Sequence, residues 1–343
     1  MKQKIAITGG AGFIGVHSSN YFSSQGWEVT VIDNLERRGT KQNLEWLMSR
    51  NNVTFAFCDI KHPESVNEII KTVRPDVVLH LAAQVAVTTS VTNPRHDFLT
   101  NALGTFNVLE AVRTNCPESF FINASTNKVY GKMESVGICE RNGRYEYDTL
   151  IDGVDEEFPL DFYSPYGCSK GTADQYTLDY ARIYGIASTT FRQSCIYGTR
   201  QFGIEDQGWV AWFAIASTLK KQITVYGDGK QIRDVLHVSD LVRAYASAIG
   251  NRDKATGQAF NVGGGANNTL SLLELLEHLA VATGRKIPFA YGDWRPGDQK
   301  VFMCNIGKAK EILGWSPTIN VQAGVQELID WVQKNPEMFD WLA

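Results

Sequence analysis

A tyrosine and a lysine four residues apart, Tyr166 and Lys170, could carry out acid–base chemistry. Pro165 can begin a helix, and on a helix this spacing puts both side chains on one face. A tyrosine hydroxyl ionises near pH ~10 and is a poor base at neutral pH, but a neighbouring ammonium favours the phenolate and would lower its pKa. The pair predicts a general base that takes a proton from a substrate hydroxyl. The alternative is an ordinary surface pair, because this spacing is common by chance.

Hydroxyl side chains precede this pair at Ser125 and Thr126, directly after an apolar segment that predicts a strand. A hydroxyl at this place could share the substrate proton and shorten its path to Tyr166.

A glycine-rich turn lies near the N-terminus, between a predicted strand at 4–8 and a predicted helix. In this context glycines bind the diphosphate of a dinucleotide: Gly9 permits the tight turn, Gly12 lets the backbone approach the phosphates, and Gly15 lets helix and strand pack closely. Free backbone amides at the helix start would face the phosphates. The predicted contacts of this turn are Gly9, Gly12, Phe13, Ile14 and Gly15.

Acidic residues end the next two predicted strands. Asp33 can accept hydrogen bonds from both ribose hydroxyls of an adenosine and would repel a 2′-phosphate, which favours NAD over NADP. Arg37 and Arg38 leave NADP as an alternative cofactor, since an arginine here could bind the 2′-phosphate. Asp59 could contact the adenine, cap the next helix, or do both.

Short apolar segments alternate with helical segments over the first 130 residues, which predicts the frame that holds these side chains. Strands are expected at 4–8, 28–33, 53–58, 77–81 and 120–123. This alternation is typical of an α/β fold with a Rossmann-type, doubly wound parallel sheet. Right-handed crossovers put the C-terminal ends of all its strands on one edge, where ligands bind.

The second half of the chain predicts a smaller, interleaved α/β lobe for the substrate. Residues 133–163 are polar and acidic and predict a long loop, followed by a helix at 165–184 and a strand at 187–192. Further on we expect a strand at 223–226 and a helix at 271–283. The expected division is 1–192 plus about 234–262 for the NAD-binding domain, and about 193–233 plus 263–343 for the nucleotide-sugar-binding domain.

The composition narrows the choice of partners. The chain has 343 residues, 20% of them charged, with a net charge of −4. We therefore expect no nucleic acid and no membrane as partner, because both favour a basic surface and no apolar run reaches the ~20 residues of a span. Six cysteines are scattered without metal-ligand spacing, which predicts no metal site, free thiols and a cytoplasmic location.

Several motifs together resemble a known family. They are TGGAGFIG (8–15), LAAQ (81–84), STNKVYG (125–131), SPYGCSK (164–170), YGDGKQIRDVLHVSD (226–240) and RPGD (295–298). In this order they resemble the extended short-chain dehydrogenase/reductases, the nucleotide-sugar epimerase/dehydratase family, over nearly the whole chain. The resemblance places the catalytic hydroxyl on Thr126, beside Tyr166 and Lys170.

The resemblance also implies the ligand contacts. Arg233 and Arg295 match diphosphate-binding arginines, and Asp298 matches a ribose contact; a structural ion pair between Arg233 and Asp234 is the alternative. The implied cofactor contacts, in addition to the glycine turn, Asp33 and Asp59, are Asn34, Ile60, Leu81, Ala82, Ala83, Gln84, Asn101, Tyr166 and Lys170. The implied substrate contacts are Gln84, Thr126, Asn127, Cys195, Tyr226, Arg233, Arg295 and Asp298.

Departures from the family pattern narrow the choice among the reactions of the family. Sugar dehydratases of the family carry Asp and Glu where this chain has Asn127 and Lys128, and an amide and an ammonium cannot move the proton and water of an elimination. Stretches at 33–47, 84–94, 161–185 and 200–213 resemble the 2-epimerases of CDP-linked dideoxyhexoses (CDP-paratose and CDP-tyvelose).

The resemblance therefore implies inversion at C2 through a 2-keto sugar, with NAD as cofactor and a role in lipopolysaccharide O-antigen biosynthesis. The alternatives are a 4-epimerase or dehydrogenase of another nucleotide sugar, and a non-catalytic NAD sensor. Helices near 93–114 and 165–184 match the pair that joins subunits in this family, which implies a homodimer or homotetramer.

Overall fold

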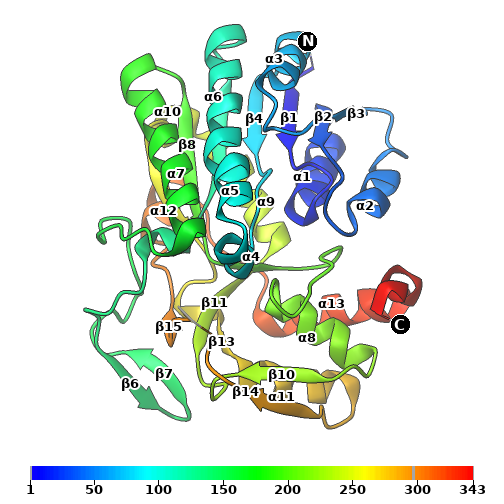
Figure 1. Ribbon diagram of the computed structural model, residues 1–343, viewed down its shortest axis with the longest axis vertical. Helices are drawn as coiled ribbons and strands as arrows, with labels where there is room; N and C mark the ends of the chain where they lie inside the picture. Colours follow the sequence, from blue (N-terminus) through cyan, green and yellow to red (C-terminus); the bar gives the residue numbers. More distant parts are fainter. Residues whose placement is uncertain (1, 296–297, 343) are drawn as a thin grey trace.

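The first lobe is built on a seven-stranded parallel sheet (Figure 1). The computed structural model describes residues 2–295 and 298–342. The strand order is β12-β8-β5-β4-β1-β2-β3, so the order reverses between β1 and β4. The strands are β1 (Lys4–Thr8), β2 (Glu28–Asp33), β3 (Val53–Phe57), β4 (Val77–His80), β5 (Phe120–Thr126), β8 (Ser188–Gln193) and β12 (Ala259–Val262). The predicted Rossmann-type sheet is confirmed.

Helices cover both faces of this sheet because its strands are apolar on both sides. In β1, Ile5 and Ile7 pack into the core on one face and Ala6 into the core on the other. The first face is covered by α1 (Phe13–Ser24), α2 (Thr40–Leu47), α9 (Val238–Gly250) and α12 (Gly307–Leu313). The second is covered by α3 (Pro63–Val73), α6 (Gly104–Asn115) and α7 (Ser164–Tyr184).

The second lobe lies below the C-terminal ends of these strands in Figure 1. Its sheets are a four-stranded group of β9 (Cys195–Tyr197), β11 (Ile232–His237), β13 (Thr269–Ser271) and β15 (Val301–Phe302), and a parallel pair of β10 (Ile223–Tyr226) and β14 (Phe289–Gly292). Its helices are α8 (Trp209–Thr218), α11 (Leu272–Thr283) and α13 (Val321–Lys334), which share an apolar core.

The predicted loop at 133–163 is wrong in one part, because it contains a β-hairpin. Strands β6 (Ile138–Arg141) and β7 (Arg144–Tyr147) pair antiparallel. β6 is largely exposed and lacks apolar alternation, and β7 is a run of only four residues, which is too short for its alternation to predict a strand. The hairpin is tied to the second lobe through the Tyr145 hydroxyl, which donates to the Asp228 carboxylate at 2.6 Å.

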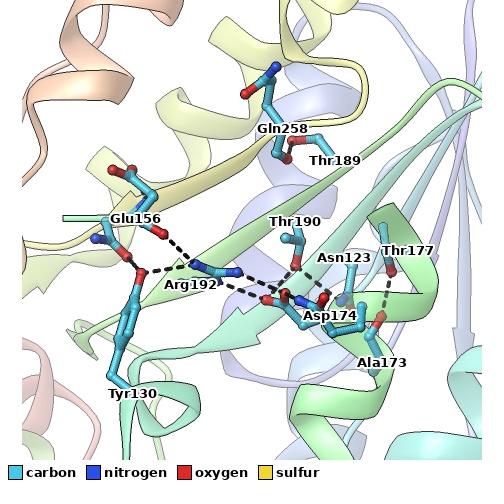
Figure 2. A network of polar contacts seen from close by, with 12 residues as sticks. Asn123, Tyr130, Glu156, Ala173, Asp174, Thr177, Thr189, Thr190, Arg192 and Gln258 are labelled. Carbon is cyan, nitrogen blue, oxygen red and sulfur yellow. Dashed lines mark hydrogen bonds and ion pairs between the residues drawn. The ribbon is translucent and has the colours of Figure 1, made fainter. Parts of the chain in front are cut away.

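A buried ion pair fixes α7 against the sheet (Figure 2). The Arg192 guanidinium in β8 contacts the Asp174 carboxylate of α7 at 3.2 Å, and both side chains are almost fully buried. Arg192 also donates to the Tyr130 hydroxyl at 3.1 Å. Tyr130 ends the short turn η2 (Asn127–Tyr130) that follows β5. One charged network therefore joins the helix that carries Tyr166 to the turn that follows Thr126.

Smaller elements complete the chain. They are α4 (Val87–Thr92), α5 (Pro94–Phe98), the π-helical turn η1 (Leu99–Leu103), α10 (Arg252–Ala255), η3 (Ala266–Asn268) and η4 (Pro336–Leu342). All six cysteines are free thiols. Within residues 2–295 and 298–342, no helix has the length and apolarity to cross a bilayer, and no group of three acidic, cysteine or histidine side chains could bind a metal.

Candidate active site

A cavity of about 550 Å³ lies at the C-terminal edge of the first sheet. This is where the strand order reverses and where open α/β sheets bind their ligands. The predicted cofactor contacts that line it are Gly9, Gly12, Phe13, Ile14, Gly15, Asp33, Asn34, Asp59, Ile60, Leu81, Ala82, Ala83, Gln84, Tyr166 and Lys170. Asn101 does not line it.

The glycine turn needs its glycines for steric reasons. Gly9 has φ +67°, and a Cβ there would lie 2.7 Å from the Ala82 amide nitrogen. A Cβ at Gly15 would lie 2.1 Å from the Gly9 carbonyl oxygen. Helix α1 begins at Phe13 without a side-chain cap, so its first amides are free to donate into the cavity. The turn can therefore hold a diphosphate against the helix start.

The Asp33 carboxylate is fixed by backbone amides at the far end of the turn. It accepts from the Ala11 amide at 3.1 Å and the Leu35 amide at 2.8 Å. Burial raises its pKa, and these amides act against that rise. Arg37 also lines the cavity, and its guanidinium donates to the Gln207 side chain of the second lobe. Asp33 therefore faces the cavity with its two oxygens in a defined place.

Asp59 is not a helix cap. Helix α3 has His62 at its N-cap, so the cap alternative is wrong. The Asp59 carboxylate instead accepts from the Lys61 amide at 3.0 Å and pairs with the Lys61 ammonium at 3.2 Å. Its side chain remains on the cavity wall.

Helix α7 brings Tyr166 and Lys170 to the cavity on one face. The helix has Pro165 in its first turn and ends before Gly185, which adopts the left-handed conformation. Burial raises the pKa of Tyr166 to about 12, and a hydrogen bond with Thr126 acts against that rise. The predicted catalytic hydroxyl of Thr126 lies near Tyr166 and donates to the Asn127 side-chain oxygen at 3.3 Å.

Lys170 is held by the backbone of β5. Its ammonium donates to the Ala124 carbonyl at 2.5 Å, and burial lowers its pKa to about 8. We expected the Lys170 ammonium to lower the pKa of Tyr166, and this is wrong for the protein without a ligand. Burial has the largest effect on that pKa, and Asp97, the charged group with the largest effect, raises it. Lowering it therefore requires a positive charge from a bound ligand.

Asp97 is a buried carboxylate beneath the site, and no sequence pattern pointed to it. It accepts from the Gln84 amide group at 2.8 Å, from the Asn101 amide group at 3.1 Å and from the Ser169 hydroxyl. Asn101 lies in the π-helical turn η1, a distortion that often marks functional sites. Asn101 thus supports Gln84 and α7 from behind, and its predicted direct cofactor contact is wrong in position.

Residues other than the predicted cofactor contacts also line the cavity. Ser125 does so, and its buried hydroxyl has no hydrogen-bond partner among the described residues. The segment 200–207 supplies Arg200, Gln201, Phe202, Gly203, Ile204 and Gln207. The only signal for that segment was its likeness to the 2-epimerases.

Of the predicted substrate residues, Gln84 lines this cavity and the others do not. Thr126 and Asn127 lie in the first lobe, where β5 ends and η2 begins, and the remaining ones are in the second lobe: Cys195, Tyr226, Arg233, Arg295 and Asp298. Arg233 in β11 donates to the Asp298 carboxylate at 2.6 Å. Its proposed pairing with Asp234 is wrong, because neighbours in a strand point to opposite faces. Asp234 instead accepts from the Ser194 hydroxyl and the Gly265 amide.

Arg295 also holds an acidic partner. Its guanidinium pairs with Asp206 at 3.1 Å and lies over the Tyr226 ring at 3.9 Å. Pro296 and Gly297 of the same motif lie outside the described residues. Asn127 and Cys195 are mostly buried, Asn127 beside Thr126 and Cys195 near Arg233. The second lobe thus presents two arginines at the substrate side, both engaged by carboxylates.

Comparisons with known proteins identify the family. The model of the GDP-mannose 4,6 dehydratase family matches residues 6–328. The chain belongs to this family. The family's name does not fix the reaction, since a CDP-paratose 2-epimerase from Salmonella typhi is 45% identical over 96% of this chain and 98% of its own length.

Solved structures of the family share the fold. The UDP-glucose 4-epimerase of Thermotoga maritima, solved with UDP-glucose, aligns with a TM-score of 0.85 and 31% identity over 97% of this chain and all of that one. The enzyme of the same name from Thermus thermophilus, in complex with NAD, aligns with a TM-score of 0.81 and 30% identity over 96% of this chain and 99% of that one. The resemblance to extended short-chain dehydrogenase/reductases is confirmed.

Proposed function

We propose that this protein is an NAD-dependent epimerase that inverts C2 of a CDP-linked dideoxyhexose, interconverting CDP-paratose and CDP-tyvelose. The observation that carries the proposal is the 45% identity to a CDP-paratose 2-epimerase over nearly the full length of both chains. The 4-epimerases named above are about 30% identical, which makes them weaker guides to the reacting carbon.

The cavity fits the cofactor. Its wall offers free amides at the start of α1, glycines where a Cβ would collide with backbone, and the fixed Asp33 carboxylate for ribose hydroxyls. The unpartnered Ser125 hydroxyl and the Lys170 ammonium are polar groups at the opposite end. These groups would hold NAD, which would supply a hydride acceptor and donor for the sugar and, in its oxidised form, a positive charge that favours the Tyr166 phenolate.

The chain's own residues then handle the proton. Tyr166 removes the proton of the C2 hydroxyl while the C–H bond breaks, and returns it after the sugar has turned. Thr126, which lies near Tyr166, orients that hydroxyl. Lys170 holds its place through the Ala124 carbonyl and can bind a ribose hydroxyl. Arg233 and Arg295 hold the diphosphate while the sugar moves, since planar guanidinium groups suit phosphate oxygens.

Incubation with CDP-paratose, followed by proton NMR of the sugar, tests the proposal. We expect the C2 proton signal to change to that of the C2 epimer without net oxidation of the cofactor. Turnover of a UDP- or GDP-linked sugar, without turnover of CDP-paratose, would show that the chain is instead an epimerase of another nucleotide sugar.

We also propose that the protein forms a homodimer through α6 and α7. Aromatic side chains are exposed on this face: Tyr176 is 47% and Tyr184 52% accessible, and Phe106 packs edge-on against Tyr176. The two helices lie side by side in Figure 1, and the Tyr180 hydroxyl of α7 donates to Glu110 of α6 at 2.6 Å. Sedimentation equilibrium should give the mass of two or four chains.

A further inference from the structure

Lys128 is a cation near the substrate side of the site that no part of the mechanism above uses. It stands in the turn η2, two residues after Thr126, and its backbone amide donates to the Thr126 hydroxyl at 3.2 Å. Its side chain runs toward the second lobe, where the ammonium donates to the Gln299 side chain at 3.2 Å. Gln299 in turn donates to the carbonyl of Gly131. Lys128 thus bridges the catalytic turn and the lobe that holds the predicted diphosphate arginines.

The surroundings of Lys128 carry an excess of positive charge. Burial and the nearby Arg233 charge together lower the pKa of Lys128 to about 8, and the Asp298 charge acts in the opposite direction. Asp298, however, is already paired with Arg233 at 2.6 Å. Within residues 2–295 and 298–342, no carboxylate lies within 4 Å of the Lys128 ammonium. Two cations thus share one carboxylate, and a partly buried cluster of this kind favours an anionic ligand.

The identity of that anion rests on the proposed function and is argued from the groups that neighbour Lys128. Arg233 lies on the diphosphate side and Thr126 on the side of the reacting sugar carbon. A group between them meets the phosphate to which the sugar is attached. We propose that Lys128 is a substrate-binding residue whose ammonium binds the sugar-linked phosphate beside Arg233.

This placement also bears on which carbon reacts. C2 is three bonds from the phosphorus of the sugar-linked phosphate, whereas C4 is five bonds away along either side of the ring. A cation that holds this phosphate close to Thr126 brings C2, rather than C4, within reach of Tyr166. Lys128 is therefore a specificity-determining residue, because it sets the distance between the anchored phosphate and the general base.

The test compares ligands that differ by one phosphate. Binding of CDP and CMP is measured by calorimetry for the wild type and for Lys128→Met, Lys128→Arg and Lys132→Met. A charge-assisted hydrogen bond that is lost should weaken CDP binding about tenfold or more in Lys128→Met, with less than about threefold weakening for CMP. Lys128→Arg keeps the charge and should retain most of the CDP affinity.

Lys132→Met is the matched control. Lys132 lies four residues further along, partly exposed, over the Tyr163 ring and paired with Glu134. This variant should bind both nucleotides like the wild type. Bound NAD and the melting temperature should be the same in all four proteins, which separates a binding role from a structural one.

Each outcome has a consequence. Unchanged CDP binding in Lys128→Met, or equal weakening of CDP and CMP, would overturn the inference and leave the proposed function intact. Loss of CDP affinity in Lys128→Arg equal to that in Lys128→Met would also overturn it, since charge would then be irrelevant. If the wild type binds UDP or GDP in place of CDP, the nucleobase of the proposed function is wrong, and the same comparison with that base still decides the role of Lys128.

Discussion

The two lobes hold their charged site residues in different ways. In the first lobe the partners are backbone groups: Lys170 donates to the Ala124 carbonyl, and Asp33 accepts from the Ala11 and Leu35 amides. Backbone partners cannot move away without disturbing the sheet or the turn. The first-lobe side chains are therefore in place before a ligand arrives, as preorganised sites require.

In the second lobe the arginines also donate to backbone carbonyls, Arg233 to Ile232 and Arg295 to Glu205, but each has an acidic side chain as a further partner. Arg233 is paired with Asp298 and Arg295 with Asp206. A carboxylate on a side chain can rotate away and be replaced by a phosphate, so under the proposed function these arginines would exchange partners when the substrate binds. The proposed function thus pairs a rigid cofactor side with a substrate side whose contacts can exchange while a sugar turns between two faces.

The strongest test of the rigid side is Tyr166→Phe. Phenylalanine lacks the hydroxyl that is proposed to take the substrate proton, so kcat should fall by about 10²- to 10⁴-fold. Bound NAD should be unchanged, because the ring remains. Tyr176→Phe, on an exposed turn of the same helix, is the control and should keep full activity in the NMR assay. Substantial activity in Tyr166→Phe would remove Tyr166 as the general base.

Gly15→Ala tests the rigidity of the glycine turn. Its Cβ would lie 2.1 Å from the Gly9 carbonyl oxygen, so the turn must shift. We expect a loss of about 3 kcal/mol in the free energy of unfolding and less bound NAD, measured by denaturation and acid release. Gly250→Ala has no atom within 4 Å and should change stability by less than about 1 kcal/mol. Equal stability of both variants would mean that the turn adapts.

How well the sequence predicts the cofactor side of the first lobe depends on whether each feature there is encoded by residues close together in the chain. Strands β1 and β2 have the predicted bounds, 4–8 and 28–33, because an apolar run fills the buried middle of each. The glycine turn and the Tyr166–Lys170 pair are local in sequence and were predicted with the elements that hold them. The hairpin at 138–147 was missed because its strands are only four residues long and lie in a polar, acidic segment.

The substrate side, in the second lobe, is harder to predict from the sequence because its residues contact partners far away in the chain. Arg233 and Arg295 came from the family motifs, but their partners did not. Asp206 lies in a different segment from Arg295, and nothing in the pattern of either segment indicates the pair. The sequence offered the adjacent Asp234 as partner of Arg233, which strand geometry forbids. Ion pairs between segments far apart in the chain are decided by tertiary packing, which a single sequence does not display.

The pH dependence of stability sharpens the comparison at Lys170. Burial lowers its pKa to about 8 from 10.5, so between these values the unfolded chain binds more protons than the folded one. The free energy of unfolding of the wild type, relative to Lys170→Met, should therefore rise with pH across this interval, by up to about 3 kcal/mol. Urea denaturation at pH 7.5, 9 and 10.5 would measure it. A flat difference would mean that Lys170 is solvated, contrary to a rigid backbone-held cation.

Asp206→Ala tests the exchanging side, where the expected effect is smallest. A bound diphosphate must displace Asp206 from Arg295, and removal of this partner should strengthen CDP binding by about two- to fivefold, since exposed ion pairs contribute up to about 1 kcal/mol. The Tyr226 ring continues to hold the Arg295 guanidinium in place. Glu205→Ala is the control, because Arg295 contacts only the backbone carbonyl of Glu205. Weaker CDP binding in Asp206→Ala would mean that Asp206 positions Arg295 for the ligand, and the second lobe would then be as preorganised as the first.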